Sequence, residues 1–508
     1  MADNTKPNYS SPDFDAFAPL WAKVDACLIG TEAMRASAGK TGDSIYLPQF
    51  PLEADDSYRY RLETSTFLPA YGNALESIVG AITKRPPKLS DAVSPAVVAD
   101  FENIDNAGRH WTVEAQRLLR AGVHYGAAYV LTEMPKKPNG ILDAEQAERM
   151  NFRPFSILYS AKELANWPRY VVINGSRVLQ QIVFRELASV PNGFGDAEIE
   201  RYRVWQVPVA QDMTGAFVRA GKAEWQIWEE REVDPSSRRR GQKKTELVMV
   251  DAGVSELADI PVAVFNANPS LNNPEKTDGS VLIDLANLNI KHYQLTSDHE
   301  KILHKCTPVI TAVNRKEDDT FGKVAGLDVM IDCKEGGGVS YAEPEGSSLL
   351  ERREWIAGIE KQMLEMGASL FAEGSQKSGM TATEINARGD AKQSRISQIA
   401  DAWKDCLNQV LVHFAQWKSI DDPGEVIPGV KSADLVFSSA DLPTVSLMVE
   451  KGQHSLQTLW QMEQKLGILP DDFDAETELE RIAEEKRRLM IEQPEKKPND
   501  DNGGDDQN

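Results

Sequence analysis

Cysteine is scarce in this chain of 508 residues, which contains four cysteines and no CxxC pair. Zinc ribbons and thioredoxin-like redox sites need closely spaced cysteines, so neither class is supported. We expect buried, reduced thiols at all four positions: Cys27, Cys306, Cys333 and Cys406.

Long apolar runs are also lacking. No run approaches the roughly 20 apolar residues that span a bilayer. Residues 1–19 are polar and proline-bearing, without the apolar core of a secretory signal. We therefore expect a soluble intracellular chain with no membrane partner and a flexible N-terminus over residues 1–13.

Basic residues are in deficit. The chain has 56 Lys and Arg against 78 Asp and Glu, a formal net charge of -22. Tight binding to free nucleic acid needs a basic face that neutralises phosphates, so this balance argues against it. It does not exclude a duplex that slides past, because acidic walls keep contacts brief. At this length the chain can form several packed cores.

Catalytic and metal motifs are not apparent. Residues 39–41 (Gly-Lys-Thr) resemble part of a Walker A loop, but that motif needs a glycine where Met34 stands and a strand where we predict a helix. The GxSxG and HExxH patterns are absent. Three histidines share one predicted helix without metal-ligand spacing, and we expect them to be exposed: His292, His299 and His304. We predict no catalytic, cofactor-binding or metal residues and no enzyme; an acidic hydrolase is the weaker alternative.

The clearest pattern lies between residues 345 and 417, where two long helices are separated by a polar break at 373–379. The first arm has one narrow apolar seam: Leu349, Ile356, Ile359, Met363, Met366 and Leu370. The second helix is polar at first and then carries an apolar face: Ile396, Ile399, Trp403, Leu407, Val410, Phe414 and Trp417. The break and the turns after it have nothing apolar to pack on, so we expect an exposed tip; an ordinary helical hairpin in a core is the alternative.

The remaining periodicities predict an α+β fold that is mainly helical. Predicted helices cover 14–36, 55–82, 111–124, a long segment capped at Asp278 or Ser280 and ending at Lys305, 441–466 and 475–492. A buried strand is expected at 126–132, an antiparallel meander over 155–264, short strands between 308 and 341, and a strand at 435–437. Residues 493–508 lack apolar anchors and are expected to be disordered.

A long helix, a small β unit, a long helix, a polar loop and a longer helix follow one another, and this order resembles the portal proteins of tailed double-stranded DNA bacteriophages. Short sequence segments are also similar to those of this family: residues 46–48 (Tyr-Leu-Pro), 58–87, 153–155 (Arg-Pro-Phe), 166–167 (Asn-Trp), 378–384 and 467–485. The resemblance covers roughly residues 10–490. No single motif in it is diagnostic.

The resemblance implies a wing, stem, clip and crown architecture with an antiparallel β region in the wing. Its parts would be a flexible N-terminus (1–13), wing (14–278), first stem helix (279–305), clip (306–344), second stem helix (345–372), tunnel loop (373–380), long wing helix with a following strand (381–440), crown (441–492) and disordered tail (493–508).

The resemblance also implies a function. Portal proteins form a homo-oligomeric ring, usually of twelve subunits, at one capsid vertex of the virion. The ring is the channel for DNA packaging and ejection. It docks the large subunit of the terminase, then a head-completion adaptor, and sits in a shell of major capsid or scaffold protein. Assembly takes place in the host cytoplasm, and no cofactor is involved. The alternative is another self-assembling head protein, a scaffold or an adaptor.

Two groups of site residues follow from the resemblance. The tunnel loop facing the DNA channel would comprise Gly374, Ser375, Gln376, Lys377, Ser378 and Gly379. Partner docking at the clip would involve Asn314, Arg315, Lys316, Phe321 and Lys323. For Lys377, contact with DNA phosphates and simple solvation of the loop remain open.

Overall fold

The computed structural model divides into two compact units. The first holds Met1–Ala372 and Gly379–Ser432, and the second holds Glu373–Ser378 and Ala433–Asn508. The described residues are 5–36, 44–136, 144–232, 245–305, 309–315, 333–342, 347–367, 382–429, 442–451, 453, 455–465, 468–469 and 473–491.

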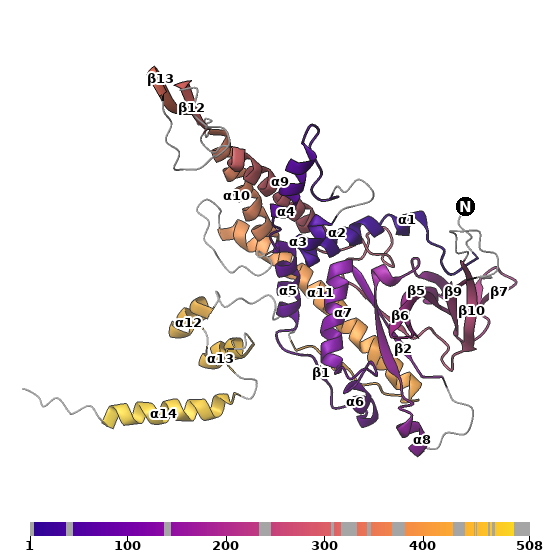
Figure 1. Cartoon of the computed structure of the whole chain (residues 1–508). Coiled ribbons are helices and arrows are strands. Elements are labelled where there is room, and N and C mark those ends of the chain that lie inside the picture. The colour runs from indigo at the N-terminus through magenta and orange to yellow at the C-terminus, as the bar shows by residue number, and fades with distance from the viewer. Residues whose placement is uncertain are drawn as a thin grey trace, which may run out of the picture. The chain divides into compact units, whose positions relative to one another are not determined.

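The first unit is an α+β fold of helices and antiparallel sheets (Figure 1), the class that the sequence predicts. Its helices are α1 (Pro12–Asp15), α2 (Ala18–Ile29), α3 (Thr31–Arg35), α4 (Asp55–Thr64), α5 (Ala70–Ile82), α6 (Pro95–Phe101), α7 (Trp111–Tyr125), α8 (Ala144–Arg149), α9 (Ile283–Lys305), α10 (Ser347–Gly367) and α11 (Ala382–Trp417). Its strands are β1 (Lys88–Leu89), β2 (Ala127–Glu133), β3 (Phe155–Ser160), β4 (Arg169–Ile173), β5 (Ser176–Asn192), β6 (Gly195–Gln206), β7 (Val209–Gln211), β8 (Phe217–Arg219), β9 (Glu224–Glu232), β10 (Thr245–Val254), β11 (Val262–Asn266), β12 (Val309–Arg315), β13 (Cys333–Ala342) and β14 (Val426–Ile427).

Two helices predicted as continuous are broken. The expected helix over 14–36 is three helices: α1 and α2 are separated at Ala16 and Phe17, and Gly30 separates α2 from α3 with φ +89°, a left-handed value that glycine adopts without strain. The expected helix over 55–82 is two. Ser65 leaves the helical conformation after α4, and its hydroxyl bonds back to the Arg61 carbonyl at 2.6 Å. Pro69 then precedes α5, and its ring disfavours helical backbone in the residue before it.

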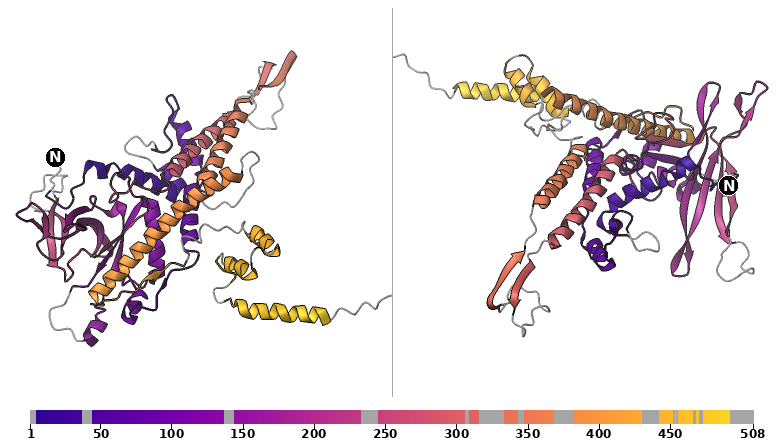
Figure 2. Two further views of the ribbon diagram at one scale, coloured as in Figure 1. Left: turned by 180° about the vertical axis from the view of Figure 1, so that it is seen from behind. Right: turned by 90° about the horizontal axis from the view of Figure 1, so that it is seen from above.

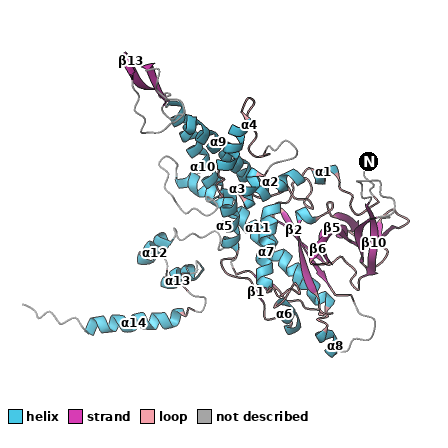
Figure 3. Cartoon of the chain, in the orientation of Figure 1, coloured by secondary structure: helices cyan, strands magenta, loops and turns pink. Residues whose placement is uncertain are grey.

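The predicted meander belongs to two sheets rather than one. Strands β3 and β11, from its two ends, flank β2 in a three-stranded antiparallel sheet. The other strands form a seven-stranded sheet in the order β10-β9-β6-β5-β4-β8-β7, antiparallel except for the β4–β8 pair. Figure 3 shows the strands and the helices that pack on them. A period of two residues identifies strands but not their partners, so it does not predict this division into two sheets.

A glycine joins α7 to β2 and holds the start of α9 in place. Gly126 has φ +93°, and a Cβ there would lie 2.2 Å from Thr277 Oγ1 and 2.3 Å from the Gly279 carbonyl oxygen. Only glycine fits both the backbone angle and this close approach. The segment that leads into α9 is thus pressed against the α7–β2 turn.

The second unit contains three helices in its described part: α12 (Leu442–Glu450), α13 (Leu456–Lys465) and α14 (Ala475–Ile491). The helix predicted over 441–466 is therefore interrupted, and α13 starts afresh where the Ser455 hydroxyl accepts a bond from the Thr458 amide at 3.3 Å. The rings of Trp460 and Phe473 meet edge to face at 5.5 Å. The strand expected at 435–437 and the tail at 493–508 lie outside the described residues.

Candidate assembly site

The candidate site is the pair of helices α9 and α10 with the β12–β13 hairpin between them, which we call the stem pair. The two helices pack side by side and the hairpin lies at their end (Figures 1 and 2). The sequence predicts these helices at 279–305 and 345–372, and the structure has them at Ile283–Lys305 and Ser347–Gly367. The assignment of these parts as stem and clip stays a prediction.

The inner faces of the stem pair meet through apolar and polar contacts. Ile359 and Met363 of α10 are buried, as the seam predicts, whereas Met366 of the same predicted seam is 40% exposed. His292 Nε2 of α9 lies 3.0 Å from a carboxylate oxygen of Glu360. The expectation that His292 is exposed is wrong, since it retains 5% of its accessible surface. A histidine among polar neighbours in sequence gives no sign that the opposite helix supplies a partner.

A buried ion cluster fixes α9 to the body of the first unit. Arg61 on α4 donates two hydrogen bonds to Glu53, at 2.8 and 3.1 Å, and Lys301 on α9 donates a third at 2.5 Å. Burial acts to raise the pKa of Glu53, but the bonds from Arg61 and Lys301 outweigh it and lower the pKa to about 2. The ring of Phe50 covers the cluster, 4.4 Å from the Arg61 guanidinium carbon.

The buried face of α9 also carries polar side chains that bond to residues 65–71. Asn289 is fully buried; it accepts a bond from the Tyr71 amide at 3.1 Å and donates one to the Leu68 carbonyl at 3.0 Å. About two helical turns after Asn289, the Ser65 hydroxyl donates a hydrogen bond of 2.7 Å to the Ser297 hydroxyl. These bonds hold α9 in register against the α4–α5 connection, although three buried atoms of the helix, Tyr293 Oη and the Nδ1 atoms of His292 and His299, have no hydrogen-bond partner among the described residues.

A chain of hydrogen bonds ties the residues before α9 to three other helices. Asp25 lies 3.0 Å from His124 Nε2, His124 Nδ1 lies 2.8 Å from the Tyr71 hydroxyl, and that hydroxyl lies 3.1 Å from the Ser280 hydroxyl. Lys162 also bonds to Asp25, at 2.5 Å. Desolvation opposes ionisation of Asp25, yet its bonds to His124 and Lys162 lower its pKa to about 2. The side chains of His124, Tyr71 and Ser280 are buried and that of Asp25 is 19% exposed; together they join α7, α5 and α2 to the segment that starts α9.

The outer face of α10 carries a second apolar stripe. Leu350, Ala357 and Leu364 are seven residues apart and therefore lie on one face of the helix. Leu350 is 62% exposed and Leu364 is 68% exposed. A Cβ added at Gly358, beside this stripe, would meet no atom within 4 Å. The helix is thus apolar on two opposite faces, of which α9 covers one.

The predicted partner-docking and channel residues are only partly placed. Asn314 and Arg315 lie on β12, which pairs with β13 in an antiparallel hairpin whose register shifts between Val313 and Arg315. Lys316, Phe321 and Lys323 lie outside the described residues, as does the whole predicted tunnel loop (373–380). For Asn314 and Arg315 only the backbone is described, so both groups of residues stay predictions.

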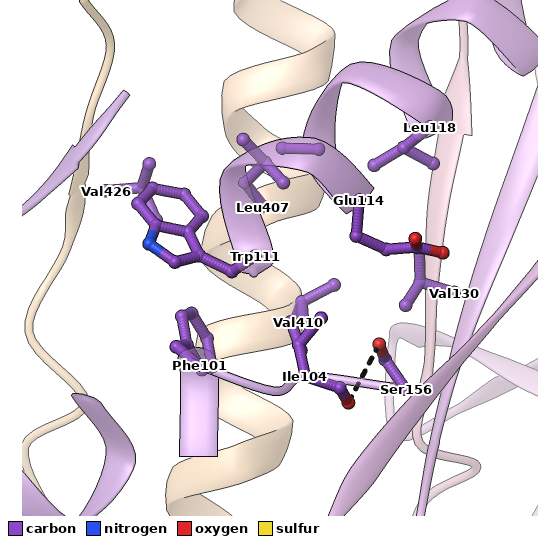
Figure 4. A pocket seen from close by; sticks show the side chains of 11 residues that line it. Phe101, Ile104, Trp111, Glu114, Leu118, Val130, Ser156, Leu407, Val410 and Val426 are labelled. Carbon is purple, nitrogen blue, oxygen red and sulfur yellow. Dashed lines mark hydrogen bonds between the residues drawn. The ribbon is translucent and has the colours of Figure 1, made fainter. Parts of the chain in front are cut away.

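The helix after the predicted loop is seated as its apolar face predicts. The following side chains of α11 are buried: Ile396, Ile399, Trp403, Leu407, Val410 and Phe414. Trp403 donates its indole N–H to the Ala115 carbonyl at 2.9 Å. Leu407 and Val410 also line a small cavity of about 20 Å³ beside α7 (Figure 4). That volume holds about one water molecule, so it is a packing defect rather than a ligand site.

A larger cleft of about 930 Å³ lies where the two sheets meet, with Trp205, Trp225 and Trp417 in its wall. Arg203 on β6 donates to Glu133 on β2 at 2.6 Å and to Glu186 on β5 at 2.7 Å. Burial raises the pKa of Glu133 even beside this guanidinium. The three groups satisfy one another, and the cluster is a fixed joint between the sheets.

Within the described ranges, no three His, Cys, Asp or Glu side chains are grouped so as to hold a metal ion. In the same part of the chain, no helix is both long and apolar enough to cross a bilayer. Cys27 and Cys406 are buried free thiols, as expected, and Cys306 lies outside the described residues. For Cys333 only the backbone is described.

Comparisons with known proteins bear on the same region. A family model described as a domain of unknown function, DUF4055, matches residues 281–418, which run from the start of α9 to the end of α11. A search of curated proteins found no match. Among solved structures, the chain is similar to one in the neck of an empty gene transfer agent particle computed with C6 symmetry, at 11% identity and a TM-score of 0.38 over 80% of this chain and 91% of that one. It is also similar to a chain in the virion of a native gene transfer agent particle, at 10% identity and a TM-score of 0.38 over 85% and 96% of the two chains.

Proposed function

We propose that this chain is a portal subunit of a tailed phage or phage-like particle, and that its copies form a ring around a channel for double-stranded DNA. The observation that carries the proposal is the second apolar stripe of α10. Leu350 and Leu364 are exposed on a helix whose opposite face is already covered by α9. In a cyclic ring each subunit meets the next through two different faces, so the free stripe of α10 would meet a different surface of the neighbouring subunit.

The anchored position of α9 supports the same assignment. A channel wall must keep its shape while a charged duplex passes, and the Arg61–Glu53–Lys301 cluster holds α9 to the body through buried, charge-assisted bonds. The net charge of -22 favours brief contacts with DNA over tight ones. Residues 373–380 would then face the channel.

The chain would act as a structural protein without catalytic activity. The ATP-driven terminase would supply the work of packaging. It would dock at the β12–β13 hairpin first, and an adaptor would dock there afterwards. Major capsid or scaffold protein would surround the ring at one vertex of the virion. A scaffold or an adaptor is the competing assignment. A portal ring and a scaffold differ in the particle shape that they predict.

Negative-stain electron microscopy of the purified full chain, with mass photometry over a range of concentrations, tests the proposal. We expect closed rings with a central hole and a single narrow mass peak. Single copies without a hole at every concentration would overturn it. Filled or elongated particles would instead favour a scaffold.

A further inference from the structure

Two edges of the seven-stranded sheet have no described strand beside them: the outer edge of β10 and the end of β5. Among the described strands, β10 pairs only with β9 and is therefore an edge strand. On the other side, β5 pairs with β4 only up to Gln181, and its last contacts along that edge are with residues 164 and 165 at Phe184 and Val183. The edge of β5 over residues 185–192 thus has no described strand beside it. Such edges present rows of backbone donors and acceptors to another chain.

The outer end of β5 and β6 also lacks support within its own sheet. Strand β9 pairs with β6 no further than Arg201, so residues 187–200 form a two-stranded ribbon. A ribbon of two strands is marginally stable alone in water. Its register places four apolar side chains on one face: Ala188, Val190, Ala197 and Ile199. A third strand along its free edge would stabilise it.

The two free edges have matching directions. Strands β5, β6, β9 and β10 are each antiparallel to the next, so β5 and β10 run in opposite directions. A second copy, rotated about an axis near the strand direction, brings its β10 beside the first copy's β5 in an antiparallel sense. Repetition of one such rotation generates a ring.

The register of the four strands also fixes which residues would meet. Glu186 lies opposite Arg201, Arg201 opposite Glu229, and Glu229 opposite Val248, so Glu186 and Val248 stand at one height in the sheet. Without a shift between copies, Leu187 of one copy faces Leu247 of the next. Leu187 is 67% exposed in the single subunit. The pairing covers it with an apolar neighbour.

We propose that, in the ring described under the proposed function, residues 185–189 of β5 in each subunit pair with residues 245–249 of β10 in its neighbour in an antiparallel sense, so that one sheet continues from subunit to subunit. This inference rests on the proposed ring, but it involves a different surface from the α10 stripe. The partner is a second copy of this chain.

Cysteine cross-linking tests the pairing. Directly opposed residues of antiparallel strands have Cβ atoms about 4.5–5.5 Å apart, close to the spacing of a disulfide. We expect mild oxidation of the Leu187→Cys/Leu247→Cys variant to give a ladder of covalent oligomers on a denaturing gel. The two single variants control for the four native cysteines, and Leu187→Cys/Val254→Cys, with its second cysteine at the other end of β10, controls for random contact.

Replacement of the two facing leucines by an oppositely charged pair provides a second, independent measurement. Leu187→Lys should raise the concentration at which rings dissociate, by about five-fold for each contact, and Leu247→Glu in the same chain should restore it. Rings that form without a cross-linked ladder and without this rescue would overturn the strand pairing and leave the proposed function standing. Wild-type protein that is monomeric throughout would overturn both.

Discussion

Glu53 and Arg61 form a two-bond ion pair at 2.8 and 3.1 Å, and the side chains retain 1% and 3% of their exposure. Removal of one partner from a buried pair costs about 3–5 kcal/mol, and because Lys301 remains bonded to Glu53, the lower end of this range applies. We therefore expect Arg61→Met to lower the free energy of unfolding by that amount in urea titrations. Glu32→Gln, which removes a surface partner of Arg35 that is 85% exposed, should change it by less than about 1 kcal/mol. Equal effects of the two changes would contradict the importance of the cluster.

Acid should loosen the attachment of α9. The pKa values of Glu53 and Asp25 are lowered to about 2 in the folded chain, below their ordinary values of 4.5 and 3.8. A carboxyl with a lowered pKa contributes stability above its unfolded pKa and loses it as the pH falls toward the folded value. We expect the thermal midpoint to fall between about pH 5 and pH 2, with a shallower fall in Glu53→Gln. A parallel pH profile for that variant would argue against Glu53 as a source of the acid sensitivity.

Two tryptophans offer a matched comparison of buried and exposed side chains. Trp403 retains 2% of its surface and bonds to the Ala115 carbonyl, whereas Trp355 is 54% exposed on α10. Trp403→Ala should lower the free energy of unfolding by about 3–5 kcal/mol, and Ile399→Ser should also cost several kcal/mol. Trp355→Ala should cost less than about 1 kcal/mol. Soluble, native-like protein after polar replacement of both Ile399 and Trp403 would contradict the burial of α11.

The spacing of apolar residues predicts the long helices and several of their buried side chains. The apolar spacing of α11 identified its buried side chains, and the seam of α10 identified Ile359 and Met363. The outer stripe of α10 was missed although its signal is present, because Leu350, Ala357 and Leu364 repeat every seven residues within a charged background. One apolar stripe is enough to predict an amphipathic helix, so the spacing does not call for a second one.

Contacts between distant residues left no local signal. Glu53 and Lys301 are 248 positions apart, and nothing in the surroundings of either indicates the other. The sequence predicts an exposed His292 for the same reason, since its partner Glu360 comes from another helix. The break at Ser65, in a strongly helical pattern, is accompanied by a buried Phe67 and by Pro69. The spacing of apolar residues does not predict such a break.

The outer stripe of α10 gives a direct test of ring assembly. Leu350→Glu/Leu364→Glu places two charges on a face that is solvent-exposed in the single subunit, so we expect normal folding by circular dichroism and a loss of rings by mass photometry. Val113→Glu/Met150→Glu adds the same two charges to exposed apolar positions on α7 and near α8, and rings should persist. Rings in both double variants would show that this stripe is not an interface.

Deletion within residues 374–379 separates the proposed channel role from assembly. The predicted loop joins α10 to α11, and both helices keep their buried contacts without it: Ile359 and Met363 on the first, Trp403 on the second. A version shortened by Ser375 to Ser378 should therefore form rings of unchanged mass while packaging or retaining less DNA in a particle-assembly assay. Replacement of the same four residues by Gly and Ser controls for length, and Lys377→Ala alone tests whether one positive charge accounts for the effect. If the shortened chain fails to form rings, the loop belongs to the assembly surface; if it packages normally, residues 374–379 do not act on the DNA.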